Sequence, residues 1–325
     1  MQRKIFVTSL LAALAFSFAW TQAQAQVWPE RPVKMVLSQP AGSGPDAVAR
    51  LIGDRLARLW GQAVVIENKP GGQNVIGANA VARATPDGYT FYFATTAALV
   101  TNSYLFKQLS YDPQKDFVPV SFVARSPFAI LVRSDSPVQT VDEMVLKSRA
   151  AGGKYSIANE GPRTFGGMIA RVFNKRTDAQ ANLVSYSSVS SSVQDLVGGH
   201  VDAAVADIAA VAELVKQGRL RMLAVSSGQR VPGFESVPPL AERLPGMEMV
   251  GWFAVVAPAG TPAAAIERFN NDLNTALADR ELADRIASIG PLAAPGMKPD
   301  QVGGFLKTEH VRWGDITKEI GLLPE

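Results

Sequence analysis

The stretch Met35–Trp60, MVLSQPAGSGPDAVARLIGDRLARLW, runs from an apolar segment through a turn rich in glycine and proline into an amphipathic segment. In its second half, apolar residues recur every three or four positions, as on one stripe of a helix. These residues are Val48, Leu51, Ile52, Leu56 and Leu59. We therefore predict a strand over Val33–Gln39, a helix over Asp46–Trp60 and a tight turn between them.

The turn itself is suited to anions. Gly42 and Gly44 let the backbone approach a ligand closely, and the following helix directs unpaired N–H groups into the same space. The turn has no basic residue, and it lacks both the Gly-Lys-Ser/Thr end of a phosphate loop and the full Gly-x-Gly-x-x-Gly fingerprint. Two interpretations stay open: an anion site built from backbone dipoles, or a purely structural turn.

Strands and helices alternate along the chain. After Val33–Gln39 and Asp46–Trp60, strands over Ala63–Glu67 and Tyr89–Ala94 flank a helix over Ile76–Ala84, a pattern that predicts a parallel sheet covered on both faces. A second series of strands follows, over Phe128–Val132, Tyr155–Ala158, Asn182–Tyr186, Ala203–Ala206 and Arg221–Ser226. Its helices are predicted over Val141–Ala150, Phe165–Asn174, Ser191–Val197 and Ala209–Gln217.

The chain passes between two lobes at two places. A strand over Phe117–Val123 is separated from Phe128–Val132 only by a short segment with Pro127, and a strand over Gly251–Val256 leads back. We predict a first lobe over 26–126, a second over 127–248 and a return to the first over 249–325. Three helices end the chain, over Ala263–Ala278, Arg280–Ile289 and Pro299–Ile320. Two connecting strands imply a cleft that can hinge.

The first 25 residues have the pattern of a signal peptide. Arg3 and Lys4 precede an apolar run, Ile5–Trp20, and Ala23-Gln24-Ala25 matches a cleavage site. The run is shorter than the ~20 residues of a membrane span, so we expect cleavage after Ala25 and no stable membrane insertion. The sequence has no cysteine for a lipid anchor or a disulfide. We expect a free, monomeric protein of the periplasm.

Composition argues against several classes of function. Loss of Arg3 and Lys4 takes the formal charge from +3 to +1, and no basic cluster with interleaved aromatics predicts nucleic-acid binding. His200 and His310 are the two histidines, and neither has the spacing of a metal ligand. Because no nucleophile elbow accompanies a histidine, we expect no catalytic residue, metal or cofactor.

Several segments together resemble one family. They are WPERPV (28–33), VVIENKPGGQNVIGANAVARATPDGYTF (64–91), LSYDPQKDFVPVSFVA (109–124), VSYSSVSSSVQDLVGGHVDAAVAD (184–207), KQGRLRMLAVSS (216–227) and GWFAVVAPAGTP (251–262). In this order they resemble the tripartite tricarboxylate transporter receptors, the Bug family of periplasmic solute-binding proteins. The resemblance spans essentially the whole chain after the signal peptide.

The resemblance implies a type II periplasmic binding protein. Its fold consists of two doubly wound α/β lobes joined by two crossover strands, with a ligand cleft between them. The lobes close on a small carboxylate, which is then delivered to the subunits of a membrane transporter. In the first lobe the resemblance implies ligand contacts from Ala41, Gly42, Ser43, Gly44 and Asp46, and from Thr95, Thr96 and Ala97.

In the second lobe the matching segments imply further contacts. The candidates are Asn159, Arg163, Thr164, Phe165, Tyr186, Ser187, Ser188 and Asp207. For the serines the alternative is helix capping alone, and for Asp207 it is a solvated loop acid.

Arg163 and Phe165 depart from the family, whose members usually have small residues such as Gly-Thr-Ser here. Arginine offers a planar fork for a carboxylate and phenylalanine a face for a ring, so we favour an aromatic dicarboxylate such as a phthalate isomer, for example terephthalate. Aliphatic di- or tricarboxylates are the next choice. The alternative is that Arg163 points to solvent and pairs with Glu160 while Phe165 begins a buried helix stripe. A ligand-dependent sensor that docks on a membrane receptor is a further alternative to transport.

Overall fold

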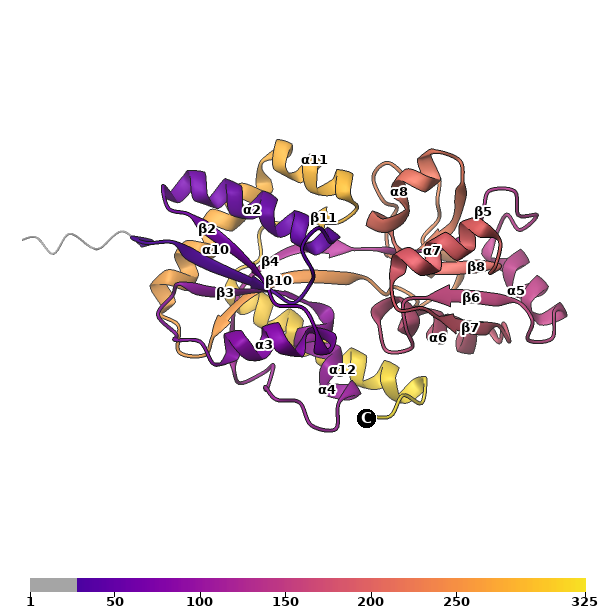
Figure 1. The fold of residues 1–325 in the computed structure, drawn as a ribbon, viewed down its shortest axis with the longest axis horizontal. Coiled ribbons are helices and arrows are strands. Elements are labelled where there is room, and N and C mark those ends of the chain that lie inside the picture. Colours follow the sequence, from indigo (N-terminus) through magenta and orange to yellow (C-terminus); the bar gives the residue numbers. More distant parts are fainter. Residues whose placement is uncertain (1–27) are drawn as a thin grey trace, which may run out of the picture.

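The computed structural model describes residues 28–325, so the predicted signal peptide lies outside the described residues. The chain forms two α/β lobes, each with a central sheet and helices on both faces (Figure 1). This is the architecture expected of a type II periplasmic binding protein.

The first sheet has six strands, in the order β11-β4-β10-β3-β1-β2. Their bounds are β1 (Val33–Leu37), β2 (Val64–Asn68), β3 (Thr90–Thr95), β4 (Phe117–Ser126), β10 (Gly251–Pro258) and β11 (Leu292–Ala293). β1 pairs in parallel with β2 and β3, whereas β10 is antiparallel to both β3 and β4. The parallel pairing predicted for the first three strands is confirmed. The antiparallel strand β10 is added because the chain returns from the other lobe.

Helices cover both faces of this sheet. One face carries α2 (Gly44–Trp60), α10 (Ala263–Ala278) and α11 (Arg280–Ile289), whose apolar residues pack with β1 and β3 in one core. The other carries η1 (Gly72–Asn74), α3 (Val75–Ala82), the π-helical segment η2 (Ala97–Thr101), α4 (Asn102–Leu105) and α12 (Pro299–Glu319). The sequence places Leu59 on the apolar stripe of α2, but this side chain is 50% exposed. The buried part of the stripe therefore ends at Leu56.

The second sheet has five strands, in the order β7-β6-β8-β5-β9. They are β5 (Phe128–Arg133), β6 (Ser156–Asn159), β7 (Asn182–Ser185), β8 (Ala203–Asp207) and β9 (Leu220–Val225). β6 is parallel to β7 and β8, while β5 is antiparallel to β8 and β9. The helices are α5 (Val141–Ala150), α6 (Phe165–Thr177), α7 (Val189–Gly198), α8 (Ile208–Lys216) and the short α9 (Leu240–Arg243).

Two crossings connect the lobes. Only Pro127 separates β4 from β5, and β10 begins at Gly251 beside Ser126, so the outgoing and returning strands are hydrogen-bonded neighbours. Helix α12 packs on β4, and its last turns reach below the second lobe (Figure 1). The hinge region is thus two adjacent strands flanked by one long helix.

Candidate functional site

The carboxyl ends of the parallel strands face the interlobe space. Phe128, where the chain enters the second lobe, pairs with Asp207 at the end of β8. In the first lobe Phe253, near the start of the returning strand, pairs with Thr95 at the end of β3. Because both crossings join these edges, the loops after β1, β3, β6, β7 and β8 lie between the lobes, where α/β sheets bind ligands. All the predicted ligand residues lie on these loops or at the strand and helix ends that adjoin them.

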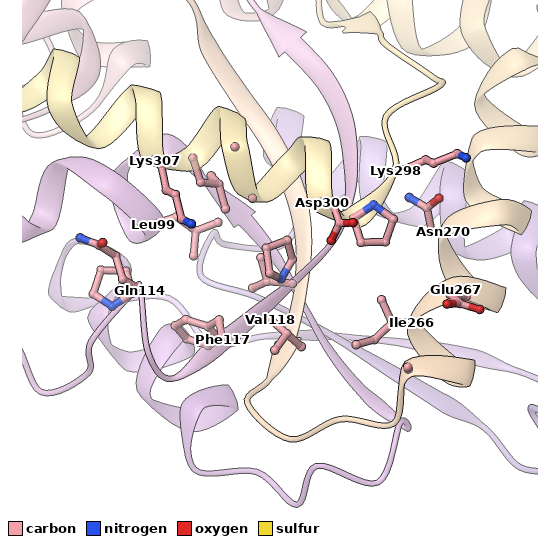
Figure 2. Close-up of a pocket in the computed structure, with 18 of the residues that line it drawn as sticks. Leu99, Gln114, Phe117, Val118, Ile266, Glu267, Asn270, Lys298, Asp300 and Lys307 are labelled. Atoms are coloured by element: carbon pink, nitrogen blue, oxygen red, sulfur yellow. The ribbon is translucent and has the colours of Figure 1, made fainter.

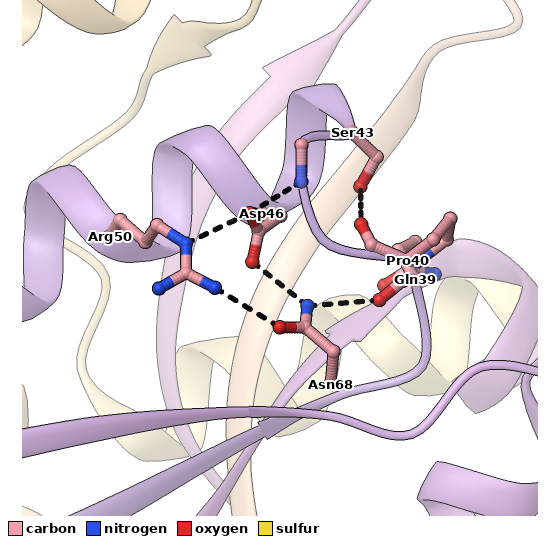
Figure 3. A network of polar contacts seen from close by, with 7 residues as sticks. Gln39, Pro40, Ser43, Asp46, Arg50 and Asn68 are labelled. Atoms are coloured by element: carbon pink, nitrogen blue, oxygen red, sulfur yellow. Dashed lines mark hydrogen bonds and ion pairs between the residues drawn. The ribbon is translucent and has the colours of Figure 1, made fainter.

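The first-lobe turn is organised around the buried carboxylate of Asp46, which is 2% exposed (Figure 3). Asp46 accepts hydrogen bonds from the Gly42 N–H at 2.8 Å, Arg50 Nε at 2.9 Å and Asn68 Nδ2 at 2.8 Å. Burial raises the pKa of Asp46, but these three hydrogen bonds outweigh it and lower the pKa below its usual value. The hydrogen bonds of Asp46 therefore stabilise the conformation of the turn.

Two backbone donors of the turn stay free. The Ser43 N–H and hydroxyl both bond to the Pro40 carbonyl, whereas among the described residues the N–H groups of Ala41 and Gly44 have no acceptor. A Cβ placed on Gly44 would lie 3.7 Å from the Cβ of Ala209 in the second lobe. The free donors thus lie where the turn meets the second lobe, at the N-terminus of α2.

The segment after β3 contributes a hydroxyl. Thr96 is 3% exposed, and its Oγ1 accepts from the Trp252 N–H at 3.0 Å, so it fastens β3 to the returning strand. The Oγ1 of Thr95 is buried without a hydrogen-bond partner, and Ala97 begins η2. Of the two threonines, Thr95 is the one with a free donor.

Gln39 was not predicted as a site residue. It lies two residues after the end of β1, its Nε2 donates to Asn74 Oδ1 at 2.6 Å, and its Oε1 is buried without a partner. Its position at the end of the predicted strand Val33–Gln39, just before the glycine turn, is the sequence signal that identifies it.

In the second lobe three helices begin at the same sheet edge. Thr164 caps α6 by accepting from the Gly167 N–H at 3.2 Å, Ser188 caps α7 through Ser191 at 3.1 Å, and Asp207 caps α8 through Ala210 at 3.0 Å. The first turns of these helices contain no acidic residue. Converging helix N-termini favour negative charge. The cap of α7 is neutral, so its dipole is available to an anion, whereas the first turn of α6 already binds the Glu160 carboxylate through the Gly166 N–H.

Asn159 and Tyr186 support the neighbouring loops. Asn159 is 1% exposed, and its Oδ1 accepts from the Gly161 N–H at 2.9 Å. The Tyr186 hydroxyl donates to Asp195 at 2.7 Å. Ser187 is exposed, and within residues 28–325 its hydroxyl has no partner, which leaves it free for a ligand.

Arg163 lies differently from both sequence interpretations. Its guanidinium donates to the Leu105 carbonyl at 2.6 Å and the Leu323 carbonyl at 2.9 Å, and it pairs with Glu325 at 2.7 Å. Its side chain is 14% exposed. It therefore neither points to solvent nor pairs with Glu160, but connects the second lobe to the first. Its contact with a ligand carboxylate stays a prediction.

Phe165 begins α6 and packs into the core at the hinge. Its ring lies 5.1 Å from the rings of both Phe128 and Trp313. This is the helix-stripe position that the alternative interpretation described, with partners from both lobes. Contact with a ligand ring stays a prediction.

Two acidic residues of this edge have raised pKa values. Burial raises the pKa of Glu160, and the negative charge of Asp207 raises it further. Burial also raises the pKa of Asp207. Glu160 Oε1 accepts from the Gly166 N–H at 2.9 Å, whereas Oε2 is buried without a partner. Glu160 was not predicted as a site residue.

A cavity of about 930 Å³ lies elsewhere, in the first lobe between β4, α10 and α12 (Figure 2). Phe117, Val118 and Ile266 contribute apolar lining, Lys307 lies on α12, and Lys298 directly precedes that helix. None of the predicted ligand residues lines it, and its walls come from one lobe. Closure of the two lobes would not enclose a solute there, so we place the candidate site at the facing sheet edges.

The described part of the chain contains no group of three or more histidine, cysteine or acidic residues that could hold a metal ion. Nor does residue range 28–325 include a helix long and apolar enough to cross a membrane.

The sequence profile of the tripartite tricarboxylate transporter family receptors matches residues 48–322. The chain belongs to this family. Members of the family are solute-binding receptors and not enzymes.

Individual relatives cover nearly the whole receptor. A curated protein of Bordetella bronchiseptica, from the group named UPF0065, is 34% identical over 98% of this chain and 94% of its own length. A structure of an R. palustris protein with adipate is 30% identical, with a TM-score of 0.84 over 92% of this chain and all of that one. MatC from Rhodopseudomonas palustris with bound malate is 27% identical, with a TM-score of 0.77 over 89% and 99%.

Proposed function

We propose that this receptor captures a small carboxylate between its lobes and delivers it to a tripartite tricarboxylate-type membrane transporter. The observation that carries the proposal is the pair of free N–H groups, of Ala41 and Gly44, at the N-terminus of α2 facing the second lobe. Dipoles of this kind bind an anion without a basic side chain. The relatives solved with adipate and malate support a carboxylate ligand.

The mechanism is hinge closure. A ligand carboxylate first meets the N–H groups of Ala41 and Gly44 and the hydroxyl of Thr95. The second lobe then adds Ser187 and the N-terminus of α7. Because a ligand shifts the equilibrium only by its preference for the closed form, these second-lobe contacts must supply the driving force. Moving a 1:99 equilibrium to 99:1 takes about 5.5 kcal/mol of such preference.

Among carboxylates, we favour an aliphatic dicarboxylate. The aromatic dicarboxylate rested on Arg163 and Phe165, and both side chains have other partners in this structure, Arg163 on the C-terminal segment and Phe165 between two rings. A phthalate isomer would have to displace these contacts before it could use either residue. We place the receptor in the periplasm because residues 1–25 have the pattern of a signal peptide.

Isothermal titration calorimetry of residues 26–325 tests the proposal. The panel is adipate, succinate, malate, citrate, terephthalate, phthalate and benzoate. A measurable affinity for an aliphatic dicarboxylate, with benzoate much weaker, supports the proposal. Binding of terephthalate alone would restore the aromatic prediction, and no binding by any acid would contradict a carboxylate receptor.

The sensor alternative needs a cellular test. Deletion of the gene abolishes uptake of the identified solute if the receptor serves a transporter. Uptake that persists while a transcriptional response disappears would instead identify a sensor.

A further inference from the structure

Two carboxyl groups of the second lobe, Glu160 and Asp207, lie beside the interlobe space without a basic partner. Glu160 follows β6 and Asp207 ends β8, and because these are adjacent parallel strands, the two residues lie at one sheet edge. Arg163, on the Glu160 loop, contacts the Leu105 carbonyl of the first lobe. Ala209, just after Asp207, lies against Gly44. Both acidic loops therefore border on the first lobe.

The hydrogen bonds of Glu160 leave one acceptor unused. Its Oε1 accepts from the Gly166 N–H at 2.9 Å, but Oε2 is buried and accepts from no group. The neighbouring Thr164 hydroxyl has one proton, which it donates to the Gly161 carbonyl at 2.7 Å. Within residues 28–325 neither Glu160 nor Asp207 forms an ion pair. A buried acceptor left without a donor carries an uncompensated desolvation penalty, which an incoming donor would remove.

We propose that Glu160, assisted by Asp207, selects carboxylates that also carry a hydrogen-bond donor, an ammonium or a hydroxyl group, over the unsubstituted acids. This inference rests on the proposed function and narrows its ligand class. The ligand carboxylate occupies the free N–H groups of Ala41 and Gly44, and the donor meets Glu160 Oε2. A bare second carboxylate at this position would be repelled by the two acids.

The electrostatics of the two carboxyls agree with this division of roles. Burial raises the pKa of both groups, and neither has a cation to offset it. A ligand ammonium would stabilise their ionised forms. In a receptor for anions, the anion is thus expected on the first-lobe turn and the donor on the second-lobe acids.

Matched ligands of one carbon skeleton isolate the donor. Succinate, malate and aspartate differ by hydrogen, hydroxyl and ammonium at one carbon, and adipate and 2-aminoadipate form a longer pair. Calorimetry on the wild type is expected to show at least about tenfold tighter binding of the donor-bearing member of one series than of its unsubstituted acid. Preference for malate alone identifies a hydroxyl ligand, and preference for aspartate or 2-aminoadipate an ammonium ligand.

Three variants assign the preference to residues. Glu160→Gln keeps an oxygen for the Gly166 N–H but replaces an acceptor with a donor, and Asp207→Asn keeps the capping oxygen. Glu213→Gln, at an exposed glutamate on α8, is the matched control. We expect Glu160→Gln to remove the preference while the unsubstituted acid binds as well or better, Asp207→Asn to reduce it, and Glu213→Gln to leave it unchanged.

The outcomes separate this inference from the proposed function. If unsubstituted acids bind the wild type as tightly as the donor-bearing ones, or if both cleft variants retain the preference, the inference is overturned and the carboxylate receptor stands. If no acid of either series or of the earlier panel binds, the proposed function fails and the inference with it.

Discussion

The guanidinium of Arg163, in the second lobe, donates to the carbonyl of Leu105, in the first, at 2.6 Å. The same carbonyl accepts from the Glu325 N–H at 3.0 Å, so the C-terminal residues are pinned to the first lobe where the arginine reaches it. Arg163, on which the aromatic-dicarboxylate prediction partly rested, is thus an interlobe connection in the structure.

Arg163→Ala is expected to destabilise the protein by about 1–3 kcal/mol, because two carbonyls lose a charged donor. Urea unfolding measures this, with Lys115→Ala as the control, since the Lys115 side chain is 84% exposed in its ion pair. Calorimetry distinguishes the roles of Arg163. Unchanged stability together with lost ligand affinity would show that Arg163 contacts the ligand carboxylate, as predicted from the sequence.

Asp46→Ala is expected to cost about 2–3 kcal/mol, because it leaves the Gly42 N–H and Asn68 without their buried acceptor. Asp54→Ala, at an exposed acid on the same helix, should change stability by less than about 0.5 kcal/mol. The anion site should weaken with Asp46→Ala because the turn loses its shape. Equal effects of the two substitutions on stability and affinity would contradict this role.

The pKa of Asp46 is lowered in the folded state, so its stabilisation is present above the unfolded value and is lost as pH falls through the folded one. The advantage of the wild type over Asp46→Ala should therefore shrink below a pH near 3.8. Urea titrations at pH 7 and pH 3 measure this. A constant difference between the two would contradict the assignment.

The pKa values of Glu160 and Asp207 are shifted in the opposite direction from that of Asp46. Their raised pKa values mean that the folded state binds protons more tightly, so their contribution to stability is complete below the unfolded pKa and is lost as pH rises through the folded one. Without ligand, the Glu160→Gln/Asp207→Asn double variant should have a higher Tm than the wild type at pH 7, by a few degrees, and nearly the same Tm at pH 4. Parallel profiles from pH 4 to pH 8 would contradict this.

Gly290 makes a further close approach between the lobes. A Cβ at this residue, which has a φ of +121°, would lie 2.6 Å from the Ala209 nitrogen. Gly296 has a φ of +104° and open space around it, so Gly296→Ala tests backbone strain alone, about 1–3 kcal/mol. Gly290→Ala should cost more and weaken ligand binding, because the lobes must separate there. If the two substitutions reduce stability equally and leave ligand affinity unchanged, the contact between Gly290 and Ala209 does not govern closure.

The regular elements could be predicted from the sequence because their periodicity is local. The helices over Val141–Ala150, Ala263–Ala278 and Arg280–Ile289 have the predicted bounds. η2 was missed because Ala98–Thr101 is buried on all sides and shows no amphipathic period. The antiparallel direction of β10 depends on the second crossing, a property of topology and not of local pattern.

The position of the candidate loops at one sheet edge could be predicted from the sequence, but the contacts of their side chains could not. The segments after β1, β3, β6, β7 and β8 meet at the facing edges because parallel strands end together. The contacts of Arg163 depend on Leu323, 160 positions along the chain, which no local pattern reveals. Glu160 was overlooked as a site residue because its unused oxygen is a feature of packing.

Ligand-induced closure tests the central claim most directly. The chain has no cysteine, so spin labels can be placed at Arg58→Cys on α2 and Lys147→Cys on α5, two exposed positions in different lobes. Double electron–electron resonance is measured without ligand and with a saturating carboxylate identified by calorimetry. We expect the distance distribution to narrow and shift as the lobes close. A distribution unchanged by a carboxylate that binds would contradict capture between the lobes.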